Sequence, residues 1–236
     1  MNSKDVNALK EMVSVIIPAY NEANTIRITL QKVLNQKCVG QVIIVDDGST
    51  DRTLDMVKQV QDNRIFIIEH TKNLGKGSAI SSAIPTLACP IALIQDADLE
   101  YDPSEYEKLI RPILSDNADV VYGSRFLGFQ ERRVLYFWHF VANRLLTFLS
   151  NAFTNLNLSD METCYKVMKT SYLKNLSLKE KRFGVEPEIT AKLASLKLRF
   201  FEVPINYYGR TFEEGKKIRA KDGFRAVYCI LRYNLF

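Results

Sequence analysis

Cysteine and histidine are scarce in this sequence. It contains four cysteines and two histidines, and the cysteines, at positions 38, 89, 164 and 229, lie far apart in the chain. None of these residues has the short paired spacing of a zinc site. We therefore expect reduced thiols, as in a cytosolic protein, and we interpret His70 and His139 as packing or surface residues.

Long hydrophobic runs are also absent. No stretch reaches the roughly 18 uninterrupted apolar residues that a membrane-spanning helix needs, and the first residues, MNSKDVNALKEM, are too polar for a secretory signal. The 10 glycines and 7 prolines are spread along the chain, which excludes a collagen-like or low-complexity polymer. The sequence predicts a compact folded protein that does not itself cross a membrane.

The charge of the chain is only mildly unbalanced. It has 32 Lys and Arg against 27 Asp and Glu, a net charge of +5. This excess suits anionic ligands or lipid headgroups but falls short of a dedicated nucleic-acid-binding protein, so no nucleic-acid partner is expected. With 236 residues, the chain is predicted to form one elaborated domain. The sequence does not specify its oligomeric state.

The first half of the chain alternates short β-branched runs with helical patterns. Apolar stripes at helical spacing predict crossover helices at Asn24–Gln36 and Thr50–Gln61. This alternation predicts an α/β fold with a mostly parallel central sheet and flanking helices. The predicted strands are Val13–Ile17, Val42–Val45, Ile65–Ile68, Ile91–Gln95 and Val120–Tyr122.

The pattern changes after Tyr122. Val134–Leu158 is a long apolar and aromatic helical stretch, which fits a buried core helix or an amphipathic helix in a membrane interface equally well. We expect a helix after Val185 and a strand at Leu198–Val203. The following segment, YYGRTFEEGKKIRAKDG, is basic, contains glycine and is too polar to be core.

Acidic residues follow the first two predicted strands. Glu22 comes after the first strand, and Asp46 and Asp47 end the second. Because ligands of parallel sheets bind beyond the carboxyl ends of the strands, these acids indicate a shared pocket. The alternative is ordinary turn chemistry, with Ser49 or Thr50 capping the next helix.

A second acidic group follows the strand Ile91–Gln95. Asp96 and Asp98 stand two residues apart and Glu100 follows, and carboxylates of this kind suit a hard divalent cation such as Mg²⁺ or Mn²⁺. Two or three protein oxygens would leave coordination positions for a diphosphate. The alternative is a solvated acidic turn that caps the helix starting near Pro103.

These motifs together resemble the family 2 inverting glycosyltransferases. The resemblance rests on VSVIIPAYNE, VIIVDDGSTD and DADL in this order, and it continues through NLGKGSAI, VVYGSRF, DMETCYKVMK and EGKKI. It is closest to the dolichyl- and polyprenyl-phosphate mannose synthase group. It implies a single nucleotide-sugar-binding domain of the glycosyltransferase A type over 1–236, with a donor half at about 13–123 and an acceptor half at about 124–236.

The resemblance also implies a donor site and a metal site. Glu100 departs from the glutamine of many synthases in that group; we assign it to the metal as a third carboxylate, and the alternative is that it does not contact the metal. Lys76 lies in a glycine-flanked loop, where it reaches the diphosphate or sugar or is simply exposed. The implied donor residues are Pro18, Tyr20, Glu22, Asp47, Asp96, Ala97 and Asp98, with Asp96 and Asp98 on the metal.

On the acceptor side, the resemblance implies a phosphate-binding arginine at Arg125. Arg144, inside an apolar stretch, either reaches an anionic ligand or extends to solvent. Arg210 and Lys216, with Lys217 as a further candidate, occupy the loop that closes over the donor diphosphate in the family. Asp160 is the candidate general base or acceptor-positioning acid, and Glu162 is the neighbour with which it is most easily confused.

The predicted reaction is metal-dependent transfer of a hexose from a GDP-mannose or UDP-glucose type donor to a polyprenyl phosphate. A lipid phosphate is largely dianionic near neutral pH and needs no general base, whereas a saccharide hydroxyl, the alternative acceptor in cell-envelope or polysaccharide synthesis, needs one. A non-catalytic nucleotide-sugar-binding or signalling domain is the alternative from another class. The expected location is cytoplasmic, with peripheral attachment to the membrane surface.

Overall fold

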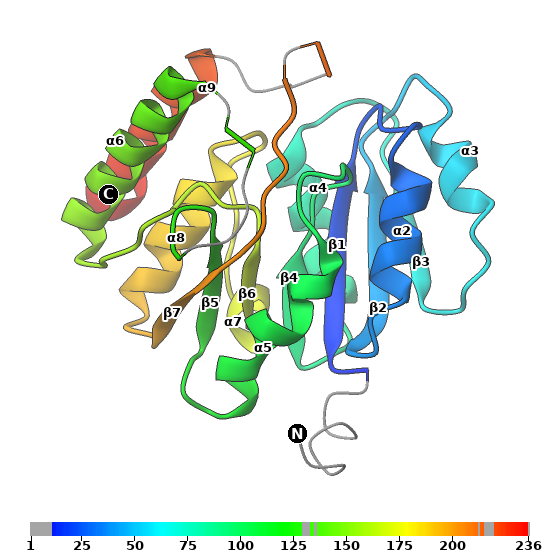
Figure 1. Cartoon of the computed structure of the whole chain (residues 1–236), viewed down its shortest axis with the longest axis horizontal. Coiled ribbons are helices and arrows are strands. Elements are labelled where there is room, and N and C mark those ends of the chain that lie inside the picture. Colours follow the sequence, from blue (N-terminus) through cyan, green and yellow to red (C-terminus); the bar gives the residue numbers. More distant parts are fainter. Residues whose placement is uncertain (1–10, 129–132, 135, 212, 215–219, 236) are drawn as a thin grey trace.

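The computed structural model describes residues 11–128, 133–134, 136–211, 213–214 and 220–235. Its centre is a seven-stranded sheet in the order β3-β2-β1-β4-β6-β5-β7 (Figure 1). Neighbouring strands are parallel except at β6, which runs antiparallel to β4 and β5. The strands are β1 (Val13–Ala19), β2 (Val39–Asp46), β3 (Ile65–Glu69), β4 (Ile91–Ile94), β5 (Val120–Ser124), β6 (Lys166–Lys169) and β7 (Phe200–Pro204).

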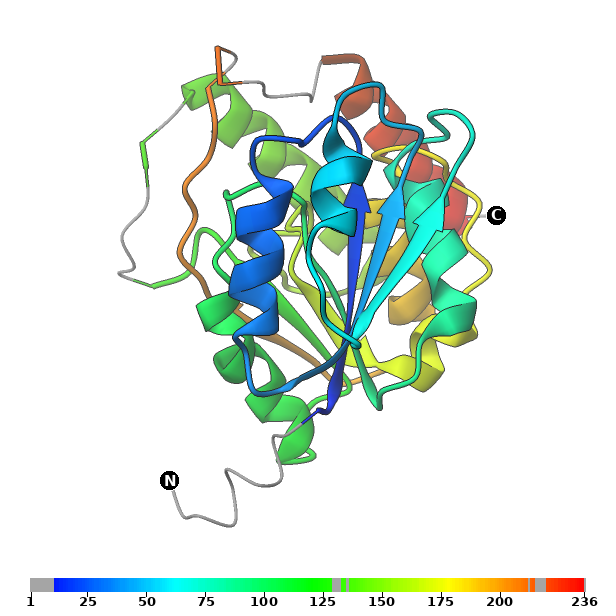
Figure 2. The same ribbon diagram turned by 90° about the vertical axis from the view of Figure 1, so that its right-hand side faces the viewer.

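Helices cover both faces of this sheet. α2 and α5 lie on one face and α4 and α8 on the other, as the side view makes clear (Figure 2). The predicted α/β fold with a mostly parallel sheet is confirmed. The helices are α2 (Ile26–Leu34), α3 (Thr53–Lys58), α4 (Lys76–Ala83), α5 (Tyr106–Leu114), α6 (Phe137–Thr154), α7 (Thr170–Lys174), α8 (Val185–Ser195) and α9 (Ala220–Leu235), with short 3₁₀ turns at Ile84–Thr86 and Pro103–Glu105.

β1 and β2 form the centre of the hydrophobic core. The valines and isoleucines of Val13–Ile17 and Val42–Val45 have no exposed surface. A strand buried on both faces is expected as a continuous β-branched run, which is why these strands were predictable from sequence. The parallel register of β1 with β2 and β4 then brings the segments that follow these strands to one edge of the sheet.

β6 was not predicted from the sequence. Its residues, KVMK, form a short run that begins and ends with lysine, so it has no recognisable strand pattern. The structure buries Lys166 by letting its ammonium group donate to the carbonyls of Met161 and Thr163. These local hydrogen bonds offset the cost of burying the charge, which allows β6 to lie between β4 and β5.

Three predicted helices are shorter than expected, and the one predicted at Asn24–Gln36 runs from Ile26 to Leu34. The helix predicted at Thr50–Gln61 begins only at Thr53, because side chains hold the preceding loop in a non-helical form. The Thr50 amide donates to Asn21 at 2.8 Å, and the Thr53 amide donates to Asp51 at 2.9 Å. The long predicted helix ends at Thr154, where Asn155 adopts a left-handed conformation with φ of 57°.

α9 was also missed, and it packs beside α6 at one end of the molecule (Figure 1). The strand and the helix expected after Val185 are confirmed as β7 and α8. Within the described residues, no helix combines the length and apolar character that crossing a bilayer requires.

Candidate active site

A cavity of about 1430 Å³ opens at the carboxyl ends of β1, β4 and β5. Tyr20 follows β1, Asp96 follows β4 and Arg125 follows β5, and all three line it. This is the edge at which parallel sheets bind ligands. Seven predicted donor residues lie in its wall: Pro18, Tyr20, Glu22, Asp47, Asp96, Ala97 and Asp98.

Asp47 has a structural task beside the cavity. One of its oxygens accepts hydrogen bonds from the Leu74 amide at 2.9 Å and contacts the His70 ring nitrogen Nδ1 at 2.7 Å, and the other accepts from the Gly75 amide at 2.7 Å. The second ring nitrogen of His70 contacts Ser82 at 2.9 Å. Asp47 therefore fixes the loop that leads into α4, and His70 is the packing residue that was expected.

Lys76 lies at the start of α4 and lines the cavity. Its ammonium group contacts Asp96 at 2.7 Å and Glu186 at 2.8 Å. Burial alone would raise the pKa of Asp96, but the charge of Lys76 and its hydrogen bond keep that pKa below the usual value. Asp96 is therefore ionised at neutral pH and already carries one cationic partner.

The pKa of Asp98 is shifted in the opposite direction from that of Asp96. Burial, together with the negative charges of Asp96 and Glu100, raises its pKa to about 8. A divalent cation would relieve this repulsion, so the donor set fits a hard metal such as Mg²⁺ or Mn²⁺. Among the described residues, no group of three or more Asp, Glu, His or Cys is arranged to hold a metal. The chain would thus supply the two aspartates, and a bound diphosphate would supply further oxygens.

Arg210 lies against these acids. Its guanidinium contacts Asp98 at 2.6 Å, Glu22 at 3.3 Å and Glu100 at 3.4 Å. Arg210 also lines the cavity, and its binding of the donor diphosphate stays a prediction. The other predicted donor cation, Lys216, and its neighbour Lys217 lie outside the described residues.

Glu100 holds the segment that carries Arg210. One carboxylate oxygen accepts from the Arg210 amide at 2.6 Å, and the other accepts from the Tyr207 hydroxyl at 2.8 Å. Its neighbour Tyr101 forms an antiparallel bridge with Tyr207. Glu100 lines the cavity, so its predicted metal role stays open, but both of its oxygens already serve this segment.

Arg125 is held in place by Asp160. Two parallel contacts of 2.7 Å join its guanidinium to the two carboxylate oxygens, and the Arg125 amide adds a third at 3.1 Å. The guanidinium also lies 5.1 Å from the ring centre of Tyr207 and 5.6 Å from that of Phe126. In the described part of the chain, the cavity wall includes Arg125 but not Asp160, which is completely buried.

Arg144 is placed differently from Arg125. It is exposed on α6, and its guanidinium donates to the Ser159 carbonyl at 3.4 Å. It is not among the described residues that line the cavity. Its predicted contact with the acceptor therefore stays a prediction. In the structure the Arg144 side chain is exposed to solvent, which is the other arrangement expected from the sequence.

Sequence reasoning did not single out Arg182 or Glu186 in the cavity wall, and it named Glu162 only as the neighbour of Asp160. Arg182 lines the cavity, and in the described part of the chain its side chain has no hydrogen-bond or ion-pair partner. Glu162 and Glu186 also line it, and each has one buried carboxylate oxygen without a partner among the described residues. Burial and the charge of Glu186 raise the pKa of Glu162 to about 7. The pattern KRFGVE could have drawn attention to Arg182, but no spacing rule marks a lone arginine.

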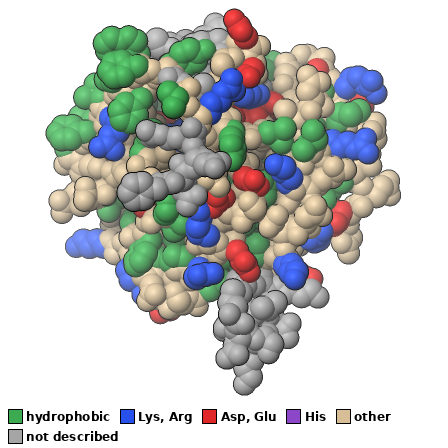
Figure 3. Space-filling view, viewed as in Figure 1, with side chains coloured by type: hydrophobic (Ala, Val, Ile, Leu, Met, Phe, Trp, Pro, Cys, Tyr) green, Lys and Arg blue, Asp and Glu red, His purple; other side chains and the backbone are tan. Residues whose placement is uncertain are grey.

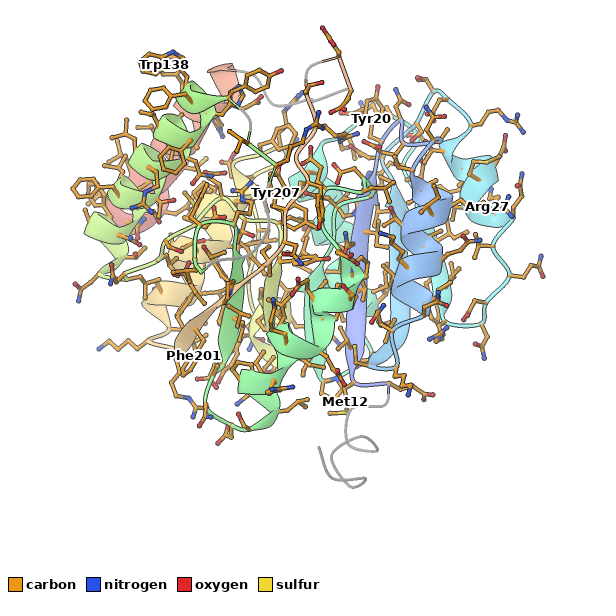
Figure 4. All side chains as sticks on the ribbon, in the orientation of Figure 1. Met12, Tyr20, Arg27, Trp138, Phe201 and Tyr207 are labelled. Carbon is orange, nitrogen blue, oxygen red and sulfur yellow. The ribbon has the colours of Figure 1, made fainter. Side chains whose placement is uncertain are left out.

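The wall of the cavity on the side of α6 and α9 is mainly apolar, with His139, Asn143 and Asp222 as polar members. Trp138 lies at the outer end of α6, and Tyr207 lies between this region and the central strands (Figure 4). One cavity thus combines an acidic end at β4, a paired arginine after β5 and a hydrocarbon wall. The apolar lining from the two helices includes Phe137, Trp138, Phe140, Leu145, Leu146, Phe224 and Val227.

Comparison with known proteins identifies relatives of the whole chain. The model of glycosyl transferase family 2 matches residues 14–177. The chain is 28% identical over 240 residues to the UDP-N-acetylglucosamine–dolichyl-phosphate N-acetylglucosaminyltransferase of Methanococcus voltae, covering 94% of this chain and 95% of that protein. It is 26% identical over 237 residues to the undecaprenyl-phosphate mannosyltransferase of Micrococcus luteus, covering 94% of each.

Solved structures share the fold. Glucosyl-3-phosphoglycerate synthase from Mycobacterium tuberculosis, in complex with Mn²⁺, uridine diphosphate and phosphoglyceric acid, aligns with a TM-score of 0.75 and 17% identity over 98% of this chain and 82% of that chain. The same enzyme with Mg²⁺ and uridine diphosphate gives a TM-score of 0.74 and 18% identity over 99% and 84% of the two chains. This likeness confirms the predicted glycosyltransferase A-type fold.

Proposed function

Because the chain belongs to glycosyl transferase family 2, we propose that it transfers a hexose from a nucleotide-sugar to a polyprenyl phosphate with the help of a divalent cation. The observation that carries this proposal is the composition of one cavity. Arg125, fixed by Asp160, lines the same cavity as a mainly apolar set of side chains from α6 and α9. A charged phosphate on a hydrocarbon chain has this combination of properties.

The acidic end of the cavity suits the donor. Asp96 and Asp98 would hold Mg²⁺ or Mn²⁺, which when bound neutralises charge on the leaving diphosphate. Arg210 and Lys76 lie beside these aspartates and are suited to contact the phosphate oxygens. The names of the relatives add support, because two of them act on dolichyl or undecaprenyl phosphate.

The reaction needs little covalent chemistry from the protein. An oxygen of the acceptor phosphate attacks the anomeric carbon, and the bond from this carbon to the diphosphate breaks with its electron pair leaving on the diphosphate. Arg125 would orient the attacking phosphate, and the cations at the acidic end would stabilise the leaving group. Because the phosphate is already anionic, no proton has to be removed.

The test is transfer of labelled sugar from a panel of UDP- and GDP-sugars to polyprenyl phosphate. The Arg125→Ala variant should lower kcat/KM for the acceptor by about 10²-fold, because it removes a charge-assisted contact to the reacting phosphate. Arg111→Ala is the matched control, since Arg111 is exposed on α5 and is not among the described residues that line the cavity. Transfer to lipid that is unchanged in Arg125→Ala would contradict the proposal.

One observation favours a second candidate acceptor, a saccharide hydroxyl. Glu162 lines the cavity and has a pKa raised to about 7 by burial and by Glu186, and a general base is most effective when its pKa is near the working pH. If labelled sugar passes to a water-soluble oligosaccharide and not to the lipid, this candidate replaces the first. Donor binding without turnover on any acceptor would favour a non-catalytic nucleotide-sugar-binding protein.

A further inference from the structure

Arg182 lies in the segment between α7 and α8 and lines the candidate active site. Its side chain is exposed, and among the described residues it has neither a hydrogen-bond nor an ion-pair partner. A Cβ atom added to Gly75 would lie 2.8 Å from the Cγ atom of Arg182. Because Gly75 directly precedes Lys76, this contact places Arg182 at the donor end of the cavity.

The other cations in the described wall of the cavity are all paired with carboxylates of the chain. In the space-filling view, basic and acidic side chains adjoin over the segment that carries Arg210 (Figure 3). An anionic ligand that binds one of these cations competes with a carboxylate already in place, whereas Arg182 has no described partner to release. The pairs are Lys76 with Asp96 and Glu186, Arg125 with Asp160, Arg133 with Glu214, and Arg210 with Glu22, Asp98 and Glu100.

Two buried acids close to Arg182 in the sequence bind other groups. The two carboxylate oxygens of Glu180 accept hydrogen bonds from the guanidinium of Arg225 in α9, at 2.8 and 2.9 Å. The two oxygens of Glu188 accept from the amides of Lys179 and Glu180, each at 2.7 Å. These contacts explain why the fold gives Arg182 no counter-charge.

The backbone next to Arg182 is fixed against the start of α4. The Ser78 amide donates a hydrogen bond to the Lys181 carbonyl at 3.1 Å. A Cβ atom added to Gly77 would collide with the carbonyl oxygen of Glu180, so the two segments can approach this closely only because position 77 is glycine. The base of the Arg182 side chain is therefore held in place, and a ligand has to immobilise only the side chain itself.

A diphosphate is the ligand that suits this cation. A guanidinium binds phosphate oxygens through parallel hydrogen bonds, and the charges of both groups strengthen them. Asp96 and Asp98 repel a diphosphate as long as no metal is bound, because both lie at the donor end of the cavity and Asp96 is ionised at neutral pH. An unpaired cation in the same cavity offsets this repulsion.

We propose that Arg182 binds the diphosphate of the nucleotide-sugar and retains it without the divalent cation. The inference rests on the proposed function for the nature of the ligand. Donor binding then has two separable parts. One part requires a metal at Asp96 and Asp98, and the other depends on Arg182 and persists in a chelator.

The experiment is calorimetric titration of the whole chain with uridine diphosphate and with guanosine diphosphate, in a chelator at low salt and again with Mn²⁺. Arg182→Ala should weaken binding in the chelator by about ten- to a hundredfold, the value of a hydrogen bond to a charged group. Arg182→Lys should recover part of this loss, because lysine keeps the charge without the planar fork. The melting temperature of ligand-free Arg182→Ala should equal that of the wild type, since no described contact is lost.

Lys181→Ala is the matched control. It removes the same charge one position away, and its exposed side chain is not among the described residues that line the cavity. Its nucleotide affinity should equal that of the wild type.

Three outcomes overturn the inference. The first is a wild type that binds nucleotide only with Mn²⁺, and the second is equal affinity of Arg182→Ala and wild type in the chelator. The third is unchanged nucleotide affinity with a raised acceptor KM, which would assign Arg182 to the acceptor phosphate. These outcomes leave the proposed function standing, whereas a wild type that binds neither nucleotide even with Mn²⁺ removes the proposed donor.

Discussion

Arg125 lies between a buried carboxylate and two aromatic rings, so its position depends on residues far away in the sequence. Asp160 binds it through both oxygens, and Glu202 in turn accepts hydrogen bonds from the amides of Ser159 and Asp160 at 2.8 to 3.2 Å. A fixed guanidinium can bind a phosphate without first losing side-chain freedom. The roles of Asp160 as anchor and as general base give different expectations for mutation.

We expect Asp160→Asn to raise the acceptor KM and to lower the free energy of unfolding, because Arg125 then stays buried without its counter-charge. The shape of the pH profile of kcat should not change, since an anchor transfers no proton. The double variant Arg125→Ala/Asp160→Asn should lose less activity than the sum of the two single losses. Kinetics from pH 5.5 to 9 test this; loss of the acidic limb of the profile would instead identify Asp160 as a base.

Glu162 gives a stability prediction with a defined sign. Burial and the charge of Glu186 raise its pKa from 4.5 to about 7. Between these values the folded protein binds a proton that the unfolded chain has released, so this residue makes the free energy of unfolding fall as the pH rises through that window. Below the window and above it, the contribution is constant.

Glu162→Gln removes this titration. The variant should therefore gain stability relative to wild type on going from about pH 5 to about pH 8, as measured by the urea midpoint at each pH. Glu213→Gln, at an exposed position, serves as the control and should shift little at either pH. An equal effect of Glu162→Gln at both pH values would contradict the raised pKa.

At the scale of elements, the segment from Tyr207 to Arg210 connects the sheet edge with the acids after β4. Glu100 accepts hydrogen bonds from both ends of this segment, and Arg210 extends from it to Asp98. The segment therefore places the guanidinium group of Arg210 next to Asp98 in the cavity. Its attachment to Glu100 determines where that cation lies.

We expect Glu100→Gln to keep activity within several-fold of wild type, because glutamine can still accept from the Arg210 amide and donate to the Tyr207 hydroxyl. Glu100→Ala should raise the donor KM more strongly by releasing the segment. The measurement is donor KM together with the Mn²⁺ concentration for half-maximal activity. A large rise in the Mn²⁺ requirement of Glu100→Gln would identify Glu100 as a metal ligand.

At the scale of the whole molecule, the cavity is bounded by elements from both halves of the chain. Asp96 and Asp98 come from the end of β4, and Arg125, Arg210 and the helices α6 and α9 come from the remainder. A donor that bridges these parts binds only the folded state, so it should raise the melting temperature by mass action. On the proposed function, Asp96 and Asp98 would make this effect depend on a metal.

We expect uridine or guanosine diphosphate with Mn²⁺ to raise the melting temperature by several degrees, and Asp98→Asn to abolish the part that requires Mn²⁺. Without ligand, Asp98→Asn should be at least as stable as wild type, because it removes a carboxylate that repels Asp96 and Glu100. Asp102→Asn is the control, since Asp102 caps the 3₁₀ turn after β4 and is not among the described cavity residues. An equal shift in chelator would remove the metal from the proposal.

The sequence by itself determined the parallel part of the sheet and the family, and it predicted the donor residues that line one cavity. These follow from local patterns: buried apolar runs define β1, β2, β4 and β5, a half-exposed run rich in isoleucine defines β3, and in a parallel sheet the residues that follow such runs share one edge. Tyr20, Asp47, Asp96 and Asp98 could thus be assigned to one site from their positions in the chain alone, and all four line the cavity.

The tertiary structure decided what local pattern does not contain. Pairing across the fold joins Arg125 to Asp160, commits Glu100 to the segment of Arg210, and leaves Arg182 without a described partner in the cavity. It also places β6 between β4 and β5 and leaves the apolar side of α6 exposed. The helical period of α6 predicts one polar and one apolar side, but it does not determine which side is buried. The contacts on the buried side of α6 join Thr147 to Met161 and Asn151 to Leu158, in the segment that follows the helix.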